Sequence, residues 1–336
     1  MKISSYAVSQ PSGSFEKYEF EFGHLKPDEV EITVSSCGVC HSDLSMKNND
    51  WGLTKYPFVP GHEVIGTISA LGETVRHLRI GQIVGLGWYA RSCGICRECI
   101  SGRPHLCFIS EGTIVGRHGG FAEKVRAQAM WAFPLPAGLD SSIAGPLFCG
   151  GITVFSPMLM QGVLPTQRVG VVGVGGLGHL AIQFLRAWGC EVTAFSTSSS
   201  KEAEVRRMGA HHFVNTKEKG AFAQLTKSLD FILVTVNVPL DWDAYFAVLR
   251  PKGKLHVVGA VPELNFAMFP LIGAETSVAG SPTGSPSSIF DMLEFCGRHN
   301  LKPIVEKFPM SQVNEAFEHL SSGKARYRII LENDFS

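Results

Sequence analysis

The sequence has no excess of charge of either sign. Its 336 residues include 30 lysines and arginines and 30 aspartates and glutamates, and neither sign is concentrated in a block. A protein that binds nucleic acid or an anionic membrane usually carries a basic patch or stripe. The balanced charge therefore argues against both kinds of partner and favours a small uncharged molecule.

The sequence also lacks a long, unbroken apolar run. Its most apolar stretch, VGVVGVGGLGHLAIQFL at 169–185, is interrupted by five glycines, His179 and Gln183. A membrane-spanning helix needs about 20 predominantly apolar residues, so we expect none. The first residues, MKISSYAVSQPSG, have no apolar stretch after the lysine, so we expect no secretory signal and a cytoplasmic protein.

Cysteine is present, but its distribution does not indicate disulfides. Four of the nine cysteines lie in CGICRECISGRPHLC at 93–107, with the spacing C-x2-C-x2-C-x7-C. Four thiolates this close can form a tetrahedral shell around a structural zinc. A ferredoxin-type iron–sulfur run begins in the same way but continues with x3-C-P, which is absent here. We therefore expect zinc at Cys93, Cys96, Cys99 and Cys107.

Glycine is frequent, with 36 residues, and it divides the chain into two patterns. Before about residue 156 it separates short β-branched runs such as DEVEITVSSCG and EVIGTISALG. From about residue 162, strand-like segments such as RVGVVGV and EVTAFS alternate with helix-like ones such as LGHLAIQFLRAWG and AFAQLTKS. These patterns predict a mainly β domain, followed by a doubly wound parallel sheet with helices on both faces.

The turn after RVGVVGV carries a dinucleotide-binding fingerprint. Residues GVGGLG at 173–178 match G-x-G-x-x-G between a strand and a helix, and a second strand follows. Glycines let the backbone approach a pyrophosphate, and the helix N-terminus offers free N–H groups. The alternative is a tight turn without a ligand. The residues expected to bind the pyrophosphate are Gly173, Gly175, Gly176, Leu177 and Gly178.

The end of the second strand predicts which dinucleotide binds. An NAD site commonly has a carboxylate here, about 20 residues after the glycines, to hold the ribose 2′-hydroxyl. This chain has STSSSK at 196–201 instead, and hydroxyls with a lysine can hold a 2′-phosphate. The alternative is a helix-capping cluster, and Ser200 could serve both purposes. We expect NADPH, bound by Ser196, Thr197, Ser198 and Lys201.

Two further segments contain potential metal ligands. The first, SSCGVCHSDL at 35–44, fits a haem attachment motif, a dithiol redox pair or the start of a metal site, and the second is GHEVIG at 61–66. With CGVCHSDLSM, YPFVPGHEVIG, the four-cysteine loop, GPLFCGGITVFSP, GVGGLGHLAIQ, EVTAFSTS and GKARYRIIL, the chain resembles the zinc-dependent medium-chain alcohol dehydrogenases. It resembles their cinnamyl alcohol dehydrogenase branch, and within it the bacterial NADPH-dependent aldehyde reductases.

The resemblance covers essentially the whole chain and implies its domain organisation. It implies a GroES-like, mainly β catalytic domain over 1–150 that holds both zinc sites. A Rossmann NADP-binding domain would follow over 151–285, and the segment 286–336 would return to the catalytic domain. The fold class expected is therefore α/β.

By resemblance, Cys40, His62 and Cys149 are the ligands of a catalytic zinc, a Cys2His set that leaves one coordination position open. Without the resemblance, His62 would be an ordinary buried histidine and Cys149 a small buried apolar residue. Glu63 would act beside the metal or as a transient ligand, unless it is a solvated surface residue. Asp43 would accept the ring N–H of His62, unless it only closes a turn.

Ser42 lies where the family has its hydroxyl proton relay, two residues after the cysteine ligand. We expect it to donate the proton, with a surface serine as the alternative. Many relatives have a histidine five residues after this cysteine, where this chain has Ser45. His41 could replace that histidine or bind the cofactor pyrophosphate, and neither role is preferred.

The resemblance implies three further cofactor contacts. Thr153 would face the nicotinamide, Asn237 would bond to its carboxamide, and Arg328 would contact a phosphate. Each of these residues could instead have only a structural role.

Aromatic residues flank the zinc-bearing segments. Of Trp51, Trp88 and Tyr89, some would line the substrate pocket by resemblance, although aromatic residues here could simply belong to the core. An apolar pocket would favour uncharged aldehydes over sugars or acids.

The favoured function is the zinc-dependent reduction of aldehydes to primary alcohols by NADPH, in a homodimer with two Zn2+ per chain. The same residues could work mainly in the direction of alcohol oxidation. The alternative that is not an enzyme is a nucleotide sensor stabilised by a structural zinc and without catalytic activity. The presence of Cys40, His62 and Cys149 argues against this alternative. A haem protein would need an export signal, which we do not find. Cys37 has no role in the favoured function, and we expect it to be a buried thiol.

Overall fold

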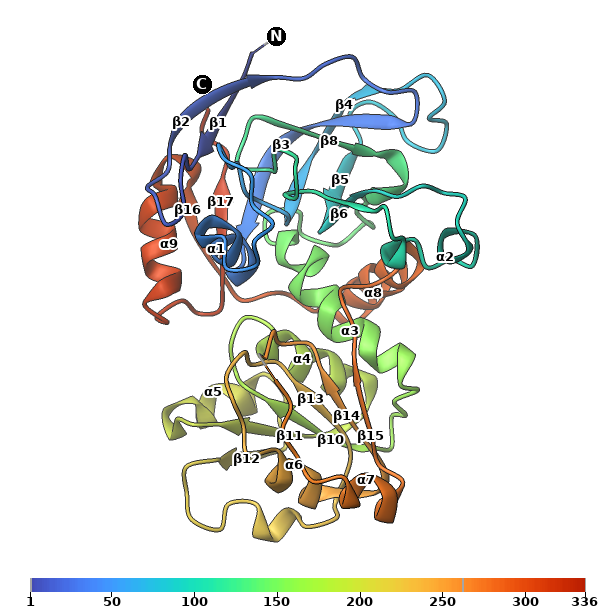
Figure 1. Cartoon of the computed structure of the whole chain (residues 1–336), viewed down its shortest axis with the longest axis vertical. Helices are drawn as coiled ribbons and strands as arrows, with labels where there is room; N and C mark the ends of the chain where they lie inside the picture. The colour runs from blue at the N-terminus through green and yellow to red at the C-terminus, as the bar shows by residue number, and fades with distance from the viewer. Residues whose placement is uncertain (1, 262, 336) are drawn as a thin grey trace. The chain divides into compact units, whose positions relative to one another are not determined.

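The computed structural model describes residues 2–261 and 263–335. The chain forms two compact units (Figure 1). The β unit contains the residues up to Cys149 and those from Ser285 onward, and the α/β unit is Gly150–Gly284. Within the described residues, no helix has both the length and the apolar character that crossing a membrane requires.

The α/β unit is built on a six-stranded parallel sheet in the order β12-β11-β10-β13-β14-β15. Its strands are β10 (Arg168–Val172), β11 (Glu191–Ser196), β12 (His212–Asn215), β13 (Leu229–Val234), β14 (Leu249–Val257) and β15 (Ser277–Gly280). Its helices are α3 (Gly150–Met160), α4 (Gly178–Trp188), α5 (Glu202–Arg207), α6 (Trp242–Val248) and α7 (Phe269–Ala274), with 3-10 turns η4 (Ser199–Lys201) and η5 (Ala223–Leu225). This strand order is that of the Rossmann fold.

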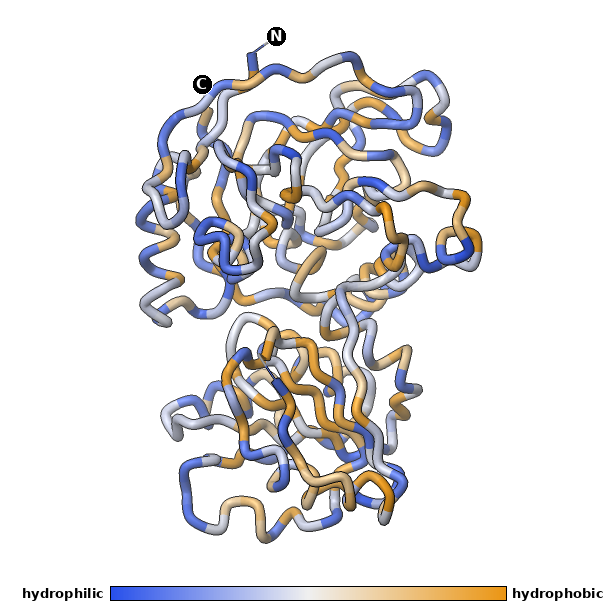
Figure 2. Tube along the Cα trace, viewed as in Figure 1, coloured by the Kyte–Doolittle hydropathy of each residue, from blue (hydrophilic) through white to orange (hydrophobic). Residues whose placement is uncertain are grey.

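Burial on both faces explains the composition of this sheet. The central strands β10 and β13 are apolar along most of their length, and their residues are almost all buried. Figure 2 shows the corresponding hydrophobic stretches in the interior of the unit. A strand covered by helices on both sides needs apolar residues on both faces, so it shows a continuous run instead of an alternation.

One helix expected from the sequence does not form. The segment AFAQLTKS gives only the short 3-10 turn η5. Gly220 and Lys227 both have positive φ, at 78° and 51°, and these left-handed residues leave room for less than two helical turns between them.

The β unit contains a seven-stranded sheet in the order β16-β17-β3-β4-β5-β9, with β8 also paired to β3. Its strands are β3 (Glu29–Val39), β4 (Val64–Leu71), β5 (Ile83–Leu86), β8 (Lys124–Gln128), β9 (Ala132–Pro134), β16 (Val305–Pro309) and β17 (Arg328–Glu332). Two small antiparallel sheets are formed by β1 (Lys2–Ala7) with β2 (Glu16–Glu21), and by β6 (Tyr89–Arg91) with β7 (Glu111–Gly112). The helices are α1 (His41–Asn48), α2 (Arg97–Ile100), α8 (Pro286–His299) and α9 (Val313–Ser321), with 3-10 turns η1 (Pro104–Leu106), η2 (Ala129–Trp131), η3 (Gly145–Phe148) and η6 (Met310–Gln312).

Strand β3 organises this unit because it pairs with β4, β8 and β17. The pairing with β17 brings the end of the chain next to the segment that contains Cys37, where Leu331 lies opposite Cys37. Strand β3 ends at Val39, so the next residue, Cys40, leaves the sheet at a fixed place.

A buried histidine, His256 on β14, belongs to the core of the α/β unit. Gln161 donates from Nε2 to His256 Nδ1 over 3.2 Å, and His256 Nε2 donates to Ser281 Oγ over 2.9 Å. Burial lowers the pKa of His256 to about 4. The ring is therefore neutral, with both nitrogens bonded.

We expect His256 to weaken the fold in mild acid. Because its folded pKa of about 4 lies below the unfolded value of about 6.5, the unfolded chain binds more protons between these limits. The free energy of unfolding should therefore fall by up to about 3 kcal/mol as the pH drops from 6.5 to 4. Urea unfolding at graded pH measures this loss.

The variant His256→Gln should show a shallower pH dependence than the wild type over this range, although its stability at neutral pH will be lower. His24→Gln, at an exposed histidine, is the control and should follow the wild type. If the free energy of unfolding falls equally with pH in His256→Gln and the wild type, His256 does not cause the loss of stability in acid.

Candidate functional site

The three expected ligands of the catalytic zinc lie together in the β unit. Cys40 Sγ is 3.9 Å from Cys149 Sγ, and His62 Nε2 is 3.3 Å from the same Cys149 sulfur. All three residues are buried. Cys40 precedes α1, His62 precedes β4, and Cys149 follows η3, so the sheet gathers ligands from three separate segments.

The glycine before His62 lets the His62 segment pack closely against its neighbours. Gly61, directly before His62, has φ of 102°, and a Cβ placed there would lie 2.8 Å from the backbone nitrogen of Phe121 and 2.9 Å from Cys37 Sγ. A side chain at this position would therefore push the His62 segment away from its neighbours.

Asp43, fully buried on α1, ties two ligand segments together. Its Oδ2 accepts from the backbone N–H of Cys40 at 2.9 Å, and its Oδ1 accepts from the backbone N–H of Gly61 at 2.9 Å. Oδ1 also lies 3.0 Å from His62 Nδ1. A carboxylate only accepts, so Nδ1 carries the proton and Nε2 presents its lone pair toward Cys149.

The donor set fits a zinc ion. A tetrahedral zinc with Zn–S bonds of about 2.3 Å separates two sulfur ligands by about 3.8 Å, close to the observed 3.9 Å between Cys40 and Cys149. The hydrogen bond with the Cys149 thiol, opposed by burial and aided by the Arg328 charge, lowers the pKa of Cys40 well below its usual range. A thiolate is the form that binds a metal.

Glu63 adds a fourth potential ligand, since its carboxylate lies within 4.8 Å of the other three donor atoms. It is fully buried, which excludes the solvated-surface alternative. Its Oε1 is ion-paired with Arg328, whereas its Oε2 has no hydrogen-bond partner among the described residues. Burial raises the pKa of Glu63 to about 7, although the Arg328 charge opposes this rise.

The sequence did not predict the ion pair between Glu63 and Arg328, which are 265 residues apart. Arg328 was expected to contact a cofactor phosphate. The structure places it at the start of β17, only 4% exposed, with its guanidinium against Glu63. The pairing of β17 with β3 brings the two together, and no local sequence signal reports such a pairing.

The residues expected to move the proton lie in the first turns of α1. Ser42 is half-buried, His41 is exposed, and Ser45 is half-buried one turn further along. Ser42 therefore follows the ligand Cys40 on the same helix end, and its role as a relay stays a prediction.

Two of the three flanking aromatic residues form a chain of ring contacts that begins at His62. The Trp88 ring lies edge-on to the His62 ring, with centroids 5.1 Å apart, and Trp51 lies edge-on to Trp88 at 6.2 Å. Tyr89 instead packs against the buried Trp131, with centroids 5.1 Å apart. Trp88 thus lies beside the expected metal ligand His62, whereas the half-buried Tyr89 packs against the core residue Trp131.

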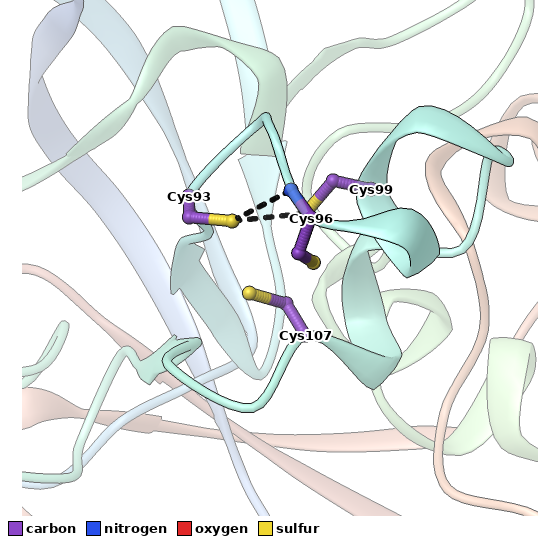
Figure 3. Close-up of side chains that lie close together, drawn as sticks. All are labelled: Cys93, Cys96, Cys99 and Cys107. Atoms are coloured by element: carbon purple, nitrogen blue, oxygen red, sulfur yellow. Dashed lines mark hydrogen bonds between the residues drawn. The ribbon is translucent and has the colours of Figure 1, made fainter.

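The four cysteines of the 93–107 loop form the second donor group, and their sulfur atoms lie within 4.8 Å of one another. Figure 3 shows the four side chains directed toward one another. Cys93 Sγ and Cys99 Sγ are 3.8 Å apart, which is the edge length of a tetrahedral zinc–thiolate site. Four sulfur ligands leave no open position, as expected for a structural metal.

In the α/β unit, the glycine turn lies at the carboxyl end of β10. Gly173 has φ of 94°, and a Cβ at Gly178 would lie 1.9 Å from the Gly173 oxygen, so both positions need glycine. A Cβ at Gly175 would meet nothing within 4 Å, which leaves that face of the turn open. Helix α4 begins at Gly178, so its free N–H groups face this turn.

The serine-rich turn lies at the same edge of the sheet, because β11 pairs in parallel with β10. Lys201 Nζ donates to the carbonyl of Val174 in the glycine turn at 2.6 Å. Ser198 donates its backbone N–H to Ser196 Oγ at 3.2 Å, and its hydroxyl lies 2.8 Å from that of Ser200. Hydroxyls and an ammonium thus border the turn.

The other expected cofactor residues also belong to the α/β unit. Asn237 is exposed just after the carboxyl end of β13, the neighbour of β10 in the sheet. Thr153 is buried in α3. Both remain predictions as cofactor contacts.

Two family models match the chain, "Alcohol dehydrogenase GroES-like domain" over residues 26–137 and "Zinc-binding dehydrogenase" over residues 176–298. The chain is 52% identical over 332 residues to the aldehyde reductase AdhA of Synechocystis sp., covering 98% of this chain and 99% of that protein. It is 35% identical over 345 residues to the 8-hydroxygeraniol dehydrogenase of Catharanthus roseus, covering 99% and 95%.

Two solved structures share the fold over nearly the full length. The cinnamyl alcohol dehydrogenase of Sorghum bicolor matches with a TM-score of 0.94 and 33% identity, covering 99% of this chain and 98% of that one. The Helicobacter pylori enzyme CAD, solved with NADP(H), matches with a TM-score of 0.91 and 27% identity, covering 99% and 98%.

Asp43→Asn should weaken the three-ligand site without affecting the four-cysteine site. An amide offers one acceptor oxygen, so one of the N–H donors of Cys40, Gly61 and His62 would face an NH2 group. We expect zinc affinity at this site to fall by about 10- to 100-fold.

Mass spectrometry of the zinc retained after dialysis against graded chelator measures this change. Asp50→Asn, at an exposed aspartate just after α1, is the control and should retain zinc like the wild type. Equal retention by Asp43→Asn and the wild type would contradict the role of Asp43.

Proposed function

Because this chain belongs to the zinc-binding alcohol dehydrogenase family, we propose that it reduces aldehydes to primary alcohols with NADPH as the hydride donor. The observation that carries the proposal is the buried group of Cys40, His62 and Cys149, which suits a zinc ion with one open position. The relative that is 52% identical is an aldehyde reductase, which supports the direction of reduction. The reverse reaction uses the same groups and depends on the cofactor pool.

The residues around the site would perform distinct tasks. A bound zinc supplies Lewis acidity and a bound NADPH supplies the hydride. Asp43 keeps the proton on His62 Nδ1, so that Nε2 stays a ligand. Trp88 and Trp51 provide an apolar wall beside His62 that would exclude water and orient an uncharged aldehyde. Ser42 would donate the proton that the product alcohol gains, and His41, its neighbour in the sequence, is the candidate for the next step of the relay.

Glu63 and Arg328 would support the metal site from inside the protein. The unpaired Oε2 of Glu63 is a spare ligand atom next to the three others. Arg328 offsets the negative charge that two thiolates and a carboxylate would otherwise concentrate there. A contact with a cofactor phosphate would use guanidinium N–H groups of Arg328 other than the one that donates to Glu63.

A second zinc would be held by Cys93, Cys96, Cys99 and Cys107 and would have a structural role. NADPH would bind with its pyrophosphate at the glycine turn of 173–178 and its 2′-phosphate at Ser196, Thr197, Ser198 and Lys201. Thr153 and Asn237 would contact the nicotinamide.

We also propose that the chain works in the cytoplasm as a homodimer. Strand β15 is at the edge of its sheet, since it pairs with β14 on one side only. The neighbouring helix α7 exposes Phe269 and Ile272. An edge strand next to apolar residues is suited to pairing with the same strand of a second copy.

A NADPH oxidation assay with a panel of aldehydes, combined with zinc analysis by mass spectrometry, tests the function. The wild type should oxidise NADPH only when an aldehyde is present and should contain two zinc ions per chain. Absence of turnover with every aldehyde of the panel would refute the proposed function.

Cys40→Ala and Cys37→Ala form a matched pair for this assay. The first should lose one zinc and at least about 10³-fold in kcat/KM, since a metal contributes several kcal/mol to the transition state. The second should keep both, because the Cys37 thiol is buried and burial raises its pKa well above its usual range. Retained activity in Cys40→Ala would show that Cys40 is not a ligand of the catalytic metal.

Cofactor preference provides an independent test. The wild type should have a higher kcat/KM with NADPH than with NADH. Ser198→Asp should lower kcat/KM for NADPH by about 100-fold, because a carboxylate repels the 2′-phosphate, and should favour NADH.

Thr226→Asp is the control, since it adds the same charge at an exposed position near the amino end of β13, the opposite edge of the sheet. Similar kinetic constants for NADPH and NADH in the wild type would contradict the assignment of NADPH.

A further inference from the structure

Thr113 has no role in the function proposed above. It forms hydrogen bonds to the backbone carbonyls of Gly87 and Trp88, two consecutive residues. It is fully buried and follows β7 directly. Its backbone N–H donates to the Trp88 carbonyl over 2.7 Å, and its hydroxyl donates to the Gly87 carbonyl over 2.6 Å. One residue thus holds two consecutive carbonyl groups.

The strands that carry these residues form the base of the four-cysteine loop. Strand β6 leads into the loop and β7 leads out of it, and they pair in antiparallel fashion, with Tyr89 opposite Gly112 and Arg91 opposite Glu111. Trp88 and Thr113 are the next residues at the end of this ladder away from the loop. We call these two strands the loop base.

The loop base is fixed to the rest of the β unit by ion pairs. Arg91 bonds through its NH2 group to both carboxylate oxygens of Asp28, at 2.9 and 3.1 Å. Glu111 is paired with Arg117 at 2.6 Å, and Arg117 also donates to the carbonyl of Arg126 on β8. The loop base is therefore tied to Asp28, directly before β3, and to Arg126 on β8.

The backbone at Trp88 has little freedom on its other side. A Cβ at Gly87 would lie 2.5 Å from the carbonyl oxygen of Phe148, the residue before Cys149. The chain at Gly87 therefore runs between Thr113 and the segment of a metal ligand. A small shift of this backbone would move the Trp88 ring relative to His62.

We propose that Thr113 is a positioning residue that sets the place of the Trp88 ring and thereby the size of the aldehyde that the site admits. The proposal rests on the proposed function, in which Trp88 is a wall of the substrate site. The Thr113 hydroxyl donates to the Gly87 carbonyl and not to a ligand, so it acts through the backbone that carries Trp88. Under this proposal, the segment that follows the four-cysteine loop helps to determine substrate specificity.

Thr113→Val tests this, because valine keeps the shape and the backbone N–H but removes the hydroxyl. The readout is the ratio of kcat/KM for cinnamaldehyde to kcat/KM for acetaldehyde, measured with NADPH. We expect this ratio to change by about tenfold, since a displaced wall alters the fit of the larger aldehyde. The change should arise in KM for cinnamaldehyde, while kcat for acetaldehyde stays within about twofold.

Two variants separate positioning from general stability. Thr113→Ser restores the hydroxyl and should restore the wild-type ratio. Thr74→Val removes a similar hydroxyl that donates to the Pro27 carbonyl at 2.7 Å on the surface of the same unit, and should leave the ratio unchanged. If Thr113→Val does not accumulate as folded protein, Thr113→Ala is measured instead by the same criteria.

A wild-type ratio in Thr113→Val, or an equal change in Thr113→Ser, would overturn the proposal. A wild type that reduces no aldehyde would refute the proposed function itself, so the two failures are distinguishable.

Discussion

The candidate active site depends on one buried carboxylate. Asp43 accepts hydrogen bonds from N–H groups of Cys40, Gly61 and His62. It therefore joins the end of β3 to the turn before β4. Burying a negative charge is costly unless hydrogen bonds offset the loss of water, and three donors achieve this here. The same contacts set the histidine tautomer. The same carboxylate therefore fixes the positions of Cys40 and His62, two of the expected metal ligands, and the direction of the His62 lone pair.

The β unit carries two groups of potential metal ligands, and their chemistry differs because their donor sets differ. Four thiolates close a site, whereas two thiolates and an imidazole leave one position open. The loop base connects these groups physically, because it supports the four-cysteine loop at one end and carries Trp88 and Thr113 at the other. The four-cysteine loop is thus linked through its base to Trp88, the residue proposed as a wall of the substrate site.

Motifs of contiguous residues were predictable from the sequence. The glycine turn, the four-cysteine spacing and the alternation of strands and helices all depend on local geometry, and the structure has each of them. The helix expected in AFAQLTKS failed because left-handed residues at Gly220 and Lys227 enclose it, and the lysine in that conformation has no sequence signature. Tyr89 begins β6 and packs against Trp131, whereas Trp88 lies in the bend before β6 and contacts His62.

By itself, the sequence determined the fold class, the glycine turn and the four-cysteine group, because each is encoded by residue type at short spacing. It indicated Cys40, His62 and Cys149 only through the family resemblance, because these residues are far apart in the chain. Only the tertiary structure decided that Arg328 pairs with Glu63 and that Thr113 donates to the carbonyls of Gly87 and Trp88. These contacts arise where β17 joins β3 and where β7 returns beside β6. Strand pairing brings distant segments together through backbone hydrogen bonds that every residue can make, so the sequence carries little record of which side chains will meet.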